Sequence, residues 1–107
     1  MKHIVNNALI RIEGVSGIPV SPFEKPNDDL DVWVLELPVP TPVSKFLSYA
    51  LAVLMHHDHL LYDLHKQGAQ IYLHIDISNL NEAPIRITPS FTEWCSKLNV
   101  TLEIVSL

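Results

Sequence analysis

The chain has 107 residues, of which 48% are hydrophobic and 18% are charged, and its net charge is −5. This length suits one domain, residues 1–107, and the composition is that of a globular protein with too little charge for disorder. An acidic domain repels phosphate backbones, so a nucleic acid partner is not expected.

Two strands are predicted in the N-terminal third, over residues 8–15 and 31–37. Apolar and polar side chains alternate in both, which is typical of a strand with one buried face. Glycine and proline residues between the two strands indicate a loop. The positions expected to point inward are Ala8, Ile10 and Ile12 in the first strand and Trp33, Leu35 and Leu37 in the second.

One long helix is predicted over residues 43–67, with Thr41 as its N-cap and Pro42 in its first turn. Gly68 supplies the C-cap. Apolar residues at helical spacing form a stripe that should face the core. The stripe consists of Val43, Leu47, Ala50, Leu54 and Leu61.

The C-terminal third predicts a strand over residues 69–78, a short helix over residues 90–98 and a last strand over residues 101–107. Thr88 and Pro89 open the short helix as N-cap and first-turn proline, and Asn99 ends it. The inward positions are Ile71, Leu73, Ile75 and Ile77 in the first of these strands and Leu102 and Ile104 in the second.

These elements predict an α+β fold. Since every strand has one apolar face, both helices should cover the same side of a four-stranded, mostly antiparallel sheet. The result is a two-layer sandwich, a ferredoxin-like variant in which a proline-rich loop replaces the helix after the first strand. Strands joined through helices should give at least one crossover.

The sheet face away from the helices is the first candidate for function. By alternation it displays charged and aromatic side chains with aliphatic ones among them, and Glu13 and Glu103 belong to it. This mixture is more typical of an interface than of plain solvent-facing surface, although an ordinary exposed sheet is the alternative. The residues singled out for binding are Arg11, Val34, Glu36, Tyr72, His74 and Asp76.

No catalytic constellation is recognised. His74 and Asp76 lie two residues apart on the open face, where they could work as an acid–base pair. No nucleophile, glycine loop or oxyanion motif accompanies them, so an enzyme is not expected. Cys95, the single cysteine, is interpreted as a small buried hydrophobic residue.

A histidine-rich segment is the second candidate. On a continuous helix His56, His59 and Asp63 converge on one side, where they could coordinate a metal ion. A single helix face cannot close a tetrahedral site without a further ligand, and the zinc-protease pattern His-Glu-x-x-His is absent. A solvated polar face in which His59 pairs with Asp63 is therefore favoured, and no cofactor is predicted.

The acidic run of residues 27–31 is the third candidate. Asp28, Asp29 and Asp31 either form a solvated turn or steer a basic partner toward the chain. Residues 1–7 do not resemble a signal peptide, and no apolar run is long enough to cross a membrane, which favours a cytoplasmic protein without membrane contact.

The C-terminal two-thirds resembles the bacterial domain of unknown function 4279 family. The resemblance is carried by residues 60–70, the strand 71–77, the start of the short helix at 87–91 and the segment 98–104. It implies a bacterial cytoplasmic domain with no established activity and no catalytic residue to carry over. Small acidic bacterial domains of this kind often look like antitoxin or immunity proteins.

The leading hypothesis is therefore a non-enzymatic module that binds another protein, or a second copy of itself as a homodimer, through the open sheet face. An immunity- or antitoxin-like role is one version of it. The alternative is a metal- or small-ligand-binding domain that uses the helix histidines.

Overall fold

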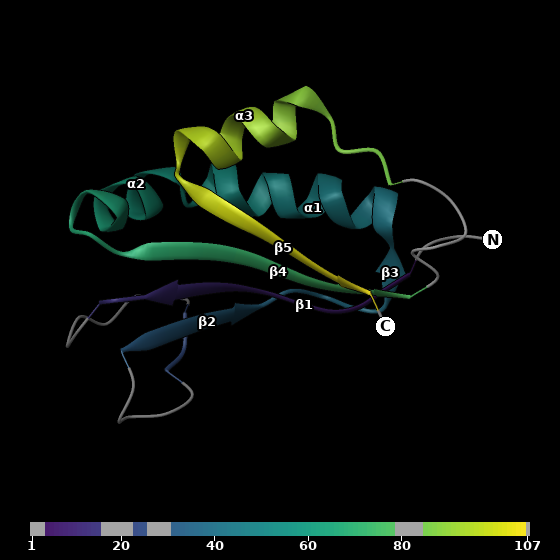
Figure 1. Cartoon of the computed structure of the whole chain (residues 1–107), viewed down its shortest axis with the longest axis horizontal. Coiled ribbons are helices and arrows are strands. Elements are labelled where there is room, and N and C mark those ends of the chain that lie inside the picture. The colour runs from purple at the N-terminus through teal and green to yellow at the C-terminus, as the bar shows by residue number, and fades with distance from the viewer. Residues whose placement is uncertain (1–3, 16–22, 26–30, 79–84, 107) are drawn as a thin grey trace.

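A computed structural model describes residues 4–15, 23–25, 31–78 and 85–106 (Figure 1). These residues form an α+β fold with a five-stranded mixed sheet and three helices. In chain order the elements are β1 (Ile4–Glu13), β2 (Val32–Glu36), β3 (Thr41–Pro42), α1 (Val43–His56), α2 (Asp58–Lys66), β4 (Gln70–Ser78), α3 (Pro89–Lys97) and β5 (Val100–Ser106).

The four longer strands have the order β2-β1-β4-β5. Strand β1 is antiparallel to β2 and β4, whereas β4 and β5 are parallel, and the short β3 pairs with the start of β1. The predicted four-stranded sheet thus lacked β3, whereas its mostly antiparallel pairing and its crossover are found among the described strands. The predicted ferredoxin-like topology is found in the first half of the fold only. There β2 and β4 flank β1 as a split βαβ unit. In the second half β4 and β5 are direct neighbours, with no strand between them.

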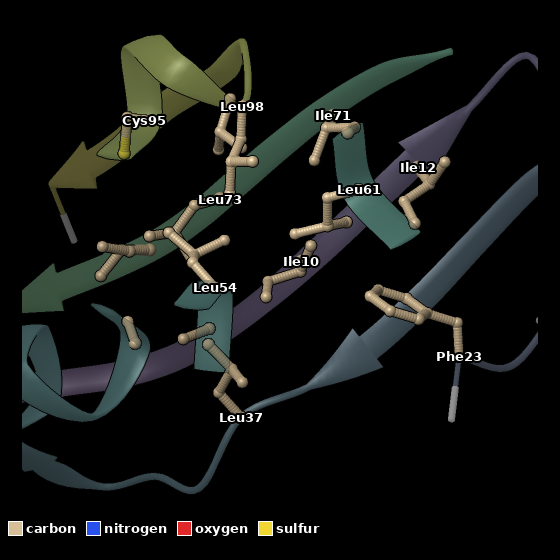
Figure 2. Close-up of a cluster of buried hydrophobic side chains, with 14 of the residues drawn as sticks. Ile10, Ile12, Phe23, Leu37, Leu54, Leu61, Ile71, Leu73, Cys95 and Leu98 are labelled. Carbon is tan, nitrogen blue, oxygen red and sulfur yellow. The ribbon is translucent and has the colours of Figure 1, made fainter. Parts of the chain in front are cut away.

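All three helices cover one face of the sheet, and the opposite face has no helix on it among the residues described (Figure 1). The covered face holds the core, as the alternation predicted. Along β4, Ile71, Leu73, Ile75 and Ile77 are at most 1% exposed. Leu54 of α1 and Leu61 of α2 pack against this face from the helix layer, and Ile10 of β1 lies beside Leu73 within the sheet (Figure 2). Burial of each such side chain contributes roughly 1.5–3 kcal/mol.

The predicted single helix over residues 43–67 is two helices. α1 ends at His56, and His57 leaves helical geometry with φ −106° and ψ 21°. The Asp58 carboxylate accepts a hydrogen bond from the His59 backbone N–H at 2.8 Å, a local bond that competes with the helical ladder. Leu54 and Leu61 are both fully buried, so the predicted apolar stripe continues across the break.

The start of α1 also differs from the prediction. Thr41 and Pro42 form β3, because they pair with Val5 and Ile4 of β1. Pro42 is thereby the N-cap, and no side chain caps the helix. At α3 the predicted Thr-Pro helix start is confirmed. Phe91 N–H donates to Thr88 Oγ1 at 3.3 Å, and the helix begins at Pro89.

The inward positions of the two edge strands are less buried than predicted. Ile104 pairs with Ile75 and so lies on the helix side, but it is 36% exposed, because β5 diverges from α3 toward its end (Figure 1). In and after β2, Leu37 is buried, whereas Trp33 and Leu35 pack against the core only in part.

None of the described helices has both the length and the apolar character that crossing a membrane requires.

The end of α2 is a Schellman motif. Ala69 N–H donates to Leu64 C=O and Gly68 N–H donates to His65 C=O, each at 3.0 Å. Gly68 has φ +93°, a left-handed conformation that side chains disfavour. The glycine predicted as the C-cap thus turns the chain from α2 into β4.

Gly68→Ala should lower the free energy of unfolding by about 1–2 kcal/mol. A Cβ at this position meets no atom within 4 Å, so the cost is conformational alone. Urea denaturation measures it. The control is Gln67→Ala, whose φ of −82° suits any residue, with a change below about 0.5 kcal/mol. Equal stability of the two variants would contradict the assignment.

Candidate functional site

The uncovered face of the sheet, called the open face here, consists of the outward residues of four strands. Strand pairing places Arg11 between Val34 and Tyr72, and Leu9 between Glu36 and His74. All six predicted binding residues lie on this face. Its members are Asn7, Leu9, Arg11, Glu13, Val32, Val34, Glu36, Gln70, Tyr72, His74, Asp76, Ser78, Thr101, Glu103 and Val105.

His74 is the centre of a polar network on the open face. Its Nε2 lies 2.9 Å from Asp76 Oδ1, and its Nδ1 lies 3.2 Å from Glu103 Oε1. A neutral imidazole has one N–H and donates to only one of these carboxylates, whereas an imidazolium donates to both. The imidazole thus links β4 to β5.

Arg11 extends the network to β1. Its Nη2 lies 3.1 Å from Glu103 Oε1, and its Nε lies 3.7 Å from Glu13 Oε2. The guanidinium carbon stands 4.5 Å from the centroid of the Tyr72 ring, a cation–π contact. The Tyr72 hydroxyl donates to Gln70 Oε1 at 2.8 Å.

Asn7 completes the network at the other end of β1. Its Nδ2 donates to Asp76 Oδ2 at 3.2 Å, so both carboxylate oxygens of Asp76 have a partner. The ionic side chains of the network are partly exposed, from 19% for Asp76 to 39% for Glu13. These contacts hold several charged groups in defined positions while leaving them accessible.

The open face carries excess negative charge. Four carboxylates lie on it, those of Glu13, Glu36, Asp76 and Glu103, against the single guanidinium of Arg11. Carboxylates therefore outnumber guanidinium groups by three on the described face. Glu36 is exposed and stands in β2, beside the network.

Glu103 contacts both Arg11 and His74 but was not among the six residues singled out from the sequence. Alternation placed it on the open face. Its position beside His74 depends on the parallel register of β4 and β5, in which residue 74 pairs with residue 103. That register has no local sequence signal.

The predicted convergence of His56, His59 and Asp63 is not found. His56 ends α1, whereas His59 and Asp63 belong to α2, beyond the break at His57. In the described part of the chain, no three His, Cys, Asp or Glu side chains gather closely enough to hold a metal ion. His59 and Asp63 are both exposed, as a solvated polar face predicts, and they form no ion pair in the described part of the chain.

His57, at the break, is the perturbed histidine. Its ring centroid lies 4.8 Å from that of His56 and 6.2 Å from that of the buried Phe23. Burial lowers the pKa of His57 below its ordinary value of 6.5, and the neighbouring His56 lowers it further. The ring therefore favours the neutral form in the folded protein.

Of the acidic run, Asp28 and Asp29 lie outside the described residues. Asp31 is exposed, and its Oδ1 lies 3.9 Å from Lys25 Nζ. Its backbone carbonyl accepts a hydrogen bond from Gly14 N–H at 3.0 Å. These contacts tie the segment before β2 to the end of β1.

Cys95 is buried in α3, as predicted (Figure 2). Burial raises the pKa of its thiol, which keeps the sulfur protonated at neutral pH. Since the thiolate is the reactive form, this cysteine serves packing rather than nucleophilic chemistry.

Comparison of the chain with family models, with curated proteins and with solved structures found no match. The resemblance to the domain of unknown function 4279 family therefore stays a prediction.

His57 should make the fold less stable as pH falls below 6.5. In the window between its lowered folded pKa and 6.5, the unfolded chain binds the proton and the folded chain does not, so acid favours unfolding. Urea denaturation across this range should show a shallower pH dependence for His57→Gln than for the unmodified chain. His59→Gln, which removes an exposed imidazole, is the control. Equal slopes for His57→Gln and the unmodified chain would contradict the assignment.

Proposed function

We propose that this chain is a non-enzymatic protein-binding domain whose open face docks a partner protein with a basic surface. The excess of negative charge on that face carries the proposal: the face displays four carboxylates and one guanidinium. Clustered charge of one sign attracts a partner of the opposite sign and speeds its association. The aliphatic residues Leu9, Val32, Val34 and Val105 supply the apolar contacts that a stable interface needs.

The network supports docking because it orders the acidic groups before a partner arrives. Binding normally costs free energy to immobilise flexible side chains, and groups that are already held reduce that cost. A carboxylate oxygen accepts more than one hydrogen bond, so Glu13 and Glu103 retain acceptor capacity beside Arg11. Glu36 is exposed and outside the network, which leaves its carboxylate open to a lysine or arginine of the partner.

A second copy of the chain is a poor partner for this face. A two-fold axis would set the same surface against itself, so that acidic groups face acidic groups. Like-charge juxtaposition at an interface costs several kcal/mol. The charge of the open face therefore favours a different protein over a face-to-face homodimer.

An immunity- or antitoxin-like role is one version of this function. Enzymes that act on nucleic acids need a basic surface, because their substrate is a polyanion. An acidic domain that occupies this surface excludes the substrate.

The compartment we propose is the cytoplasm, where the lone thiol of Cys95 stays reduced.

An octalysine peptide carrying a spin label tests the charge preference of the face. With the labelled peptide, NMR signals of the ¹⁵N-labelled chain should broaden along the outward positions of β1, β4 and β5. Glu36→Gln and Glu103→Gln should each weaken binding by about threefold to tenfold at low salt. Glu36→Gln removes a charge but leaves the network intact, whereas Glu103→Gln also removes contacts of the network. Comparing the two variants separates the effect of lost charge from the effect of lost side-chain order.

Glu93→Gln is the matched control, because Glu93 is exposed on α3 on the covered side of the sheet. It should leave binding of the peptide unchanged. Broadening centred on the helices, or an equal loss of affinity in Glu93→Gln and Glu36→Gln, would refute the proposal.

A further inference from the structure

The two edge strands of the sheet, β2 and β5, differ in the pairing of their outer backbone groups. The outer edge of β2 is paired at Val34: Glu24 N–H donates to Val34 C=O at 2.8 Å, and Val34 N–H donates to Glu24 C=O at 2.7 Å. The outer edge of β5 ends the strand order, and no described residue pairs with it. Its outward backbone groups are therefore available for strand pairing.

Strand β5 also lacks the features that protect an edge. Its sequence, Val-Thr-Leu-Glu-Ile-Val-Ser, contains no lysine, no proline and no glycine. Its pairing with β4 runs from Val100 to Ser106 without a bulge. The one charged residue, Glu103, is engaged by Arg11 and His74. An edge of this kind is a template for another strand.

Two neighbouring apolar side chains are exposed on this edge strand. Ile104 is 36% exposed on the helix side, and Val105 is 42% exposed on the open face. A strand added along β5 would cover both, because opposite residues of an antiparallel pair lie on the same face. The exposed apolar surface thus coincides with a backbone edge that no described residue pairs with.

We infer that β5 pairs antiparallel with β5 of a second copy of this chain, so that the two sheets join into one. A two-fold axis perpendicular to the sheet makes the edge its own complement. The register that sets Ile104 opposite Ile104 of the second copy is the favourable one. It places Glu103 opposite Val105, whereas centring the pair on Glu103 would oppose two carboxylates.

This edge pairing goes beyond the proposed function and does not depend on it. Because the axis is perpendicular to the sheet, both sets of helices lie on one side of the joined sheet and both open faces on the other. The acidic faces then lie side by side rather than face to face. A basic partner would meet a surface of twice the extent.

Sedimentation equilibrium of the full chain alone, over a wide range of concentrations, measures the association. The unmodified chain should form a closed dimer with twice the chain mass of 12.1 kDa. Ile104→Lys should halve the mass, because a charged side chain at the two-fold axis repels its own copy. Tyr62→Lys, the same charge change at an exposed residue of α2, should leave the dimer intact.

Hydrogen exchange of the unmodified chain gives a second readout that needs no variant. Amides of β5 should exchange more slowly as the protein concentration rises, while amides of β2 do not change. A monomer at every concentration, growth beyond the dimer, or protection at elements other than β5 would overturn the inference. The Ile104→Lys monomer should still bind octalysine, so failure of the dimer is distinct from failure of the docking face.

Discussion

Burial of one side of β4 against the helices orients the open face of this protein. Ile71, Leu73, Ile75 and Ile77 are buried, and each contributes roughly 1.5–3 kcal/mol. A slip of one residue in the register would bring all four to the surface. Because successive side chains of a strand point to opposite faces, the same constraint turns Tyr72, His74 and Asp76 outward.

The polar network is a consequence of this arrangement and not its cause. Exposed ion pairs contribute about 0–1 kcal/mol each, which is small beside the apolar burial on the other face. The contacts of His74 and Arg11 therefore serve mainly to position charges. Under the proposed function, the surplus of carboxylates on the open face would favour a basic partner over face-to-face contact with a second copy.

The two proposed interactions depend on different physical forces. Docking on the open face would depend on charge, which salt screens, whereas pairing along β5 would depend on backbone hydrogen bonds and the apolar side chains of Ile104 and Val105. Glu103 belongs to both regions, since it is part of the network and lies between the apolar residues of β5. Its contacts with Arg11 and His74 keep its charge on the face and away from the edge.

Local signals in the sequence determined the burial pattern of β4, the glycine turn after α2, the Thr88 cap of α3 and the placement of the six predicted binding residues on one face. These features depend on alternation or capping, which act over a few neighbouring residues. Tertiary structure alone decided the pairing that draws Thr41 into β3 and the contact of Arg11 with Glu103, 92 positions away. Contacts between residues so distant in sequence depend on strand order and register, which only the folded chain specifies.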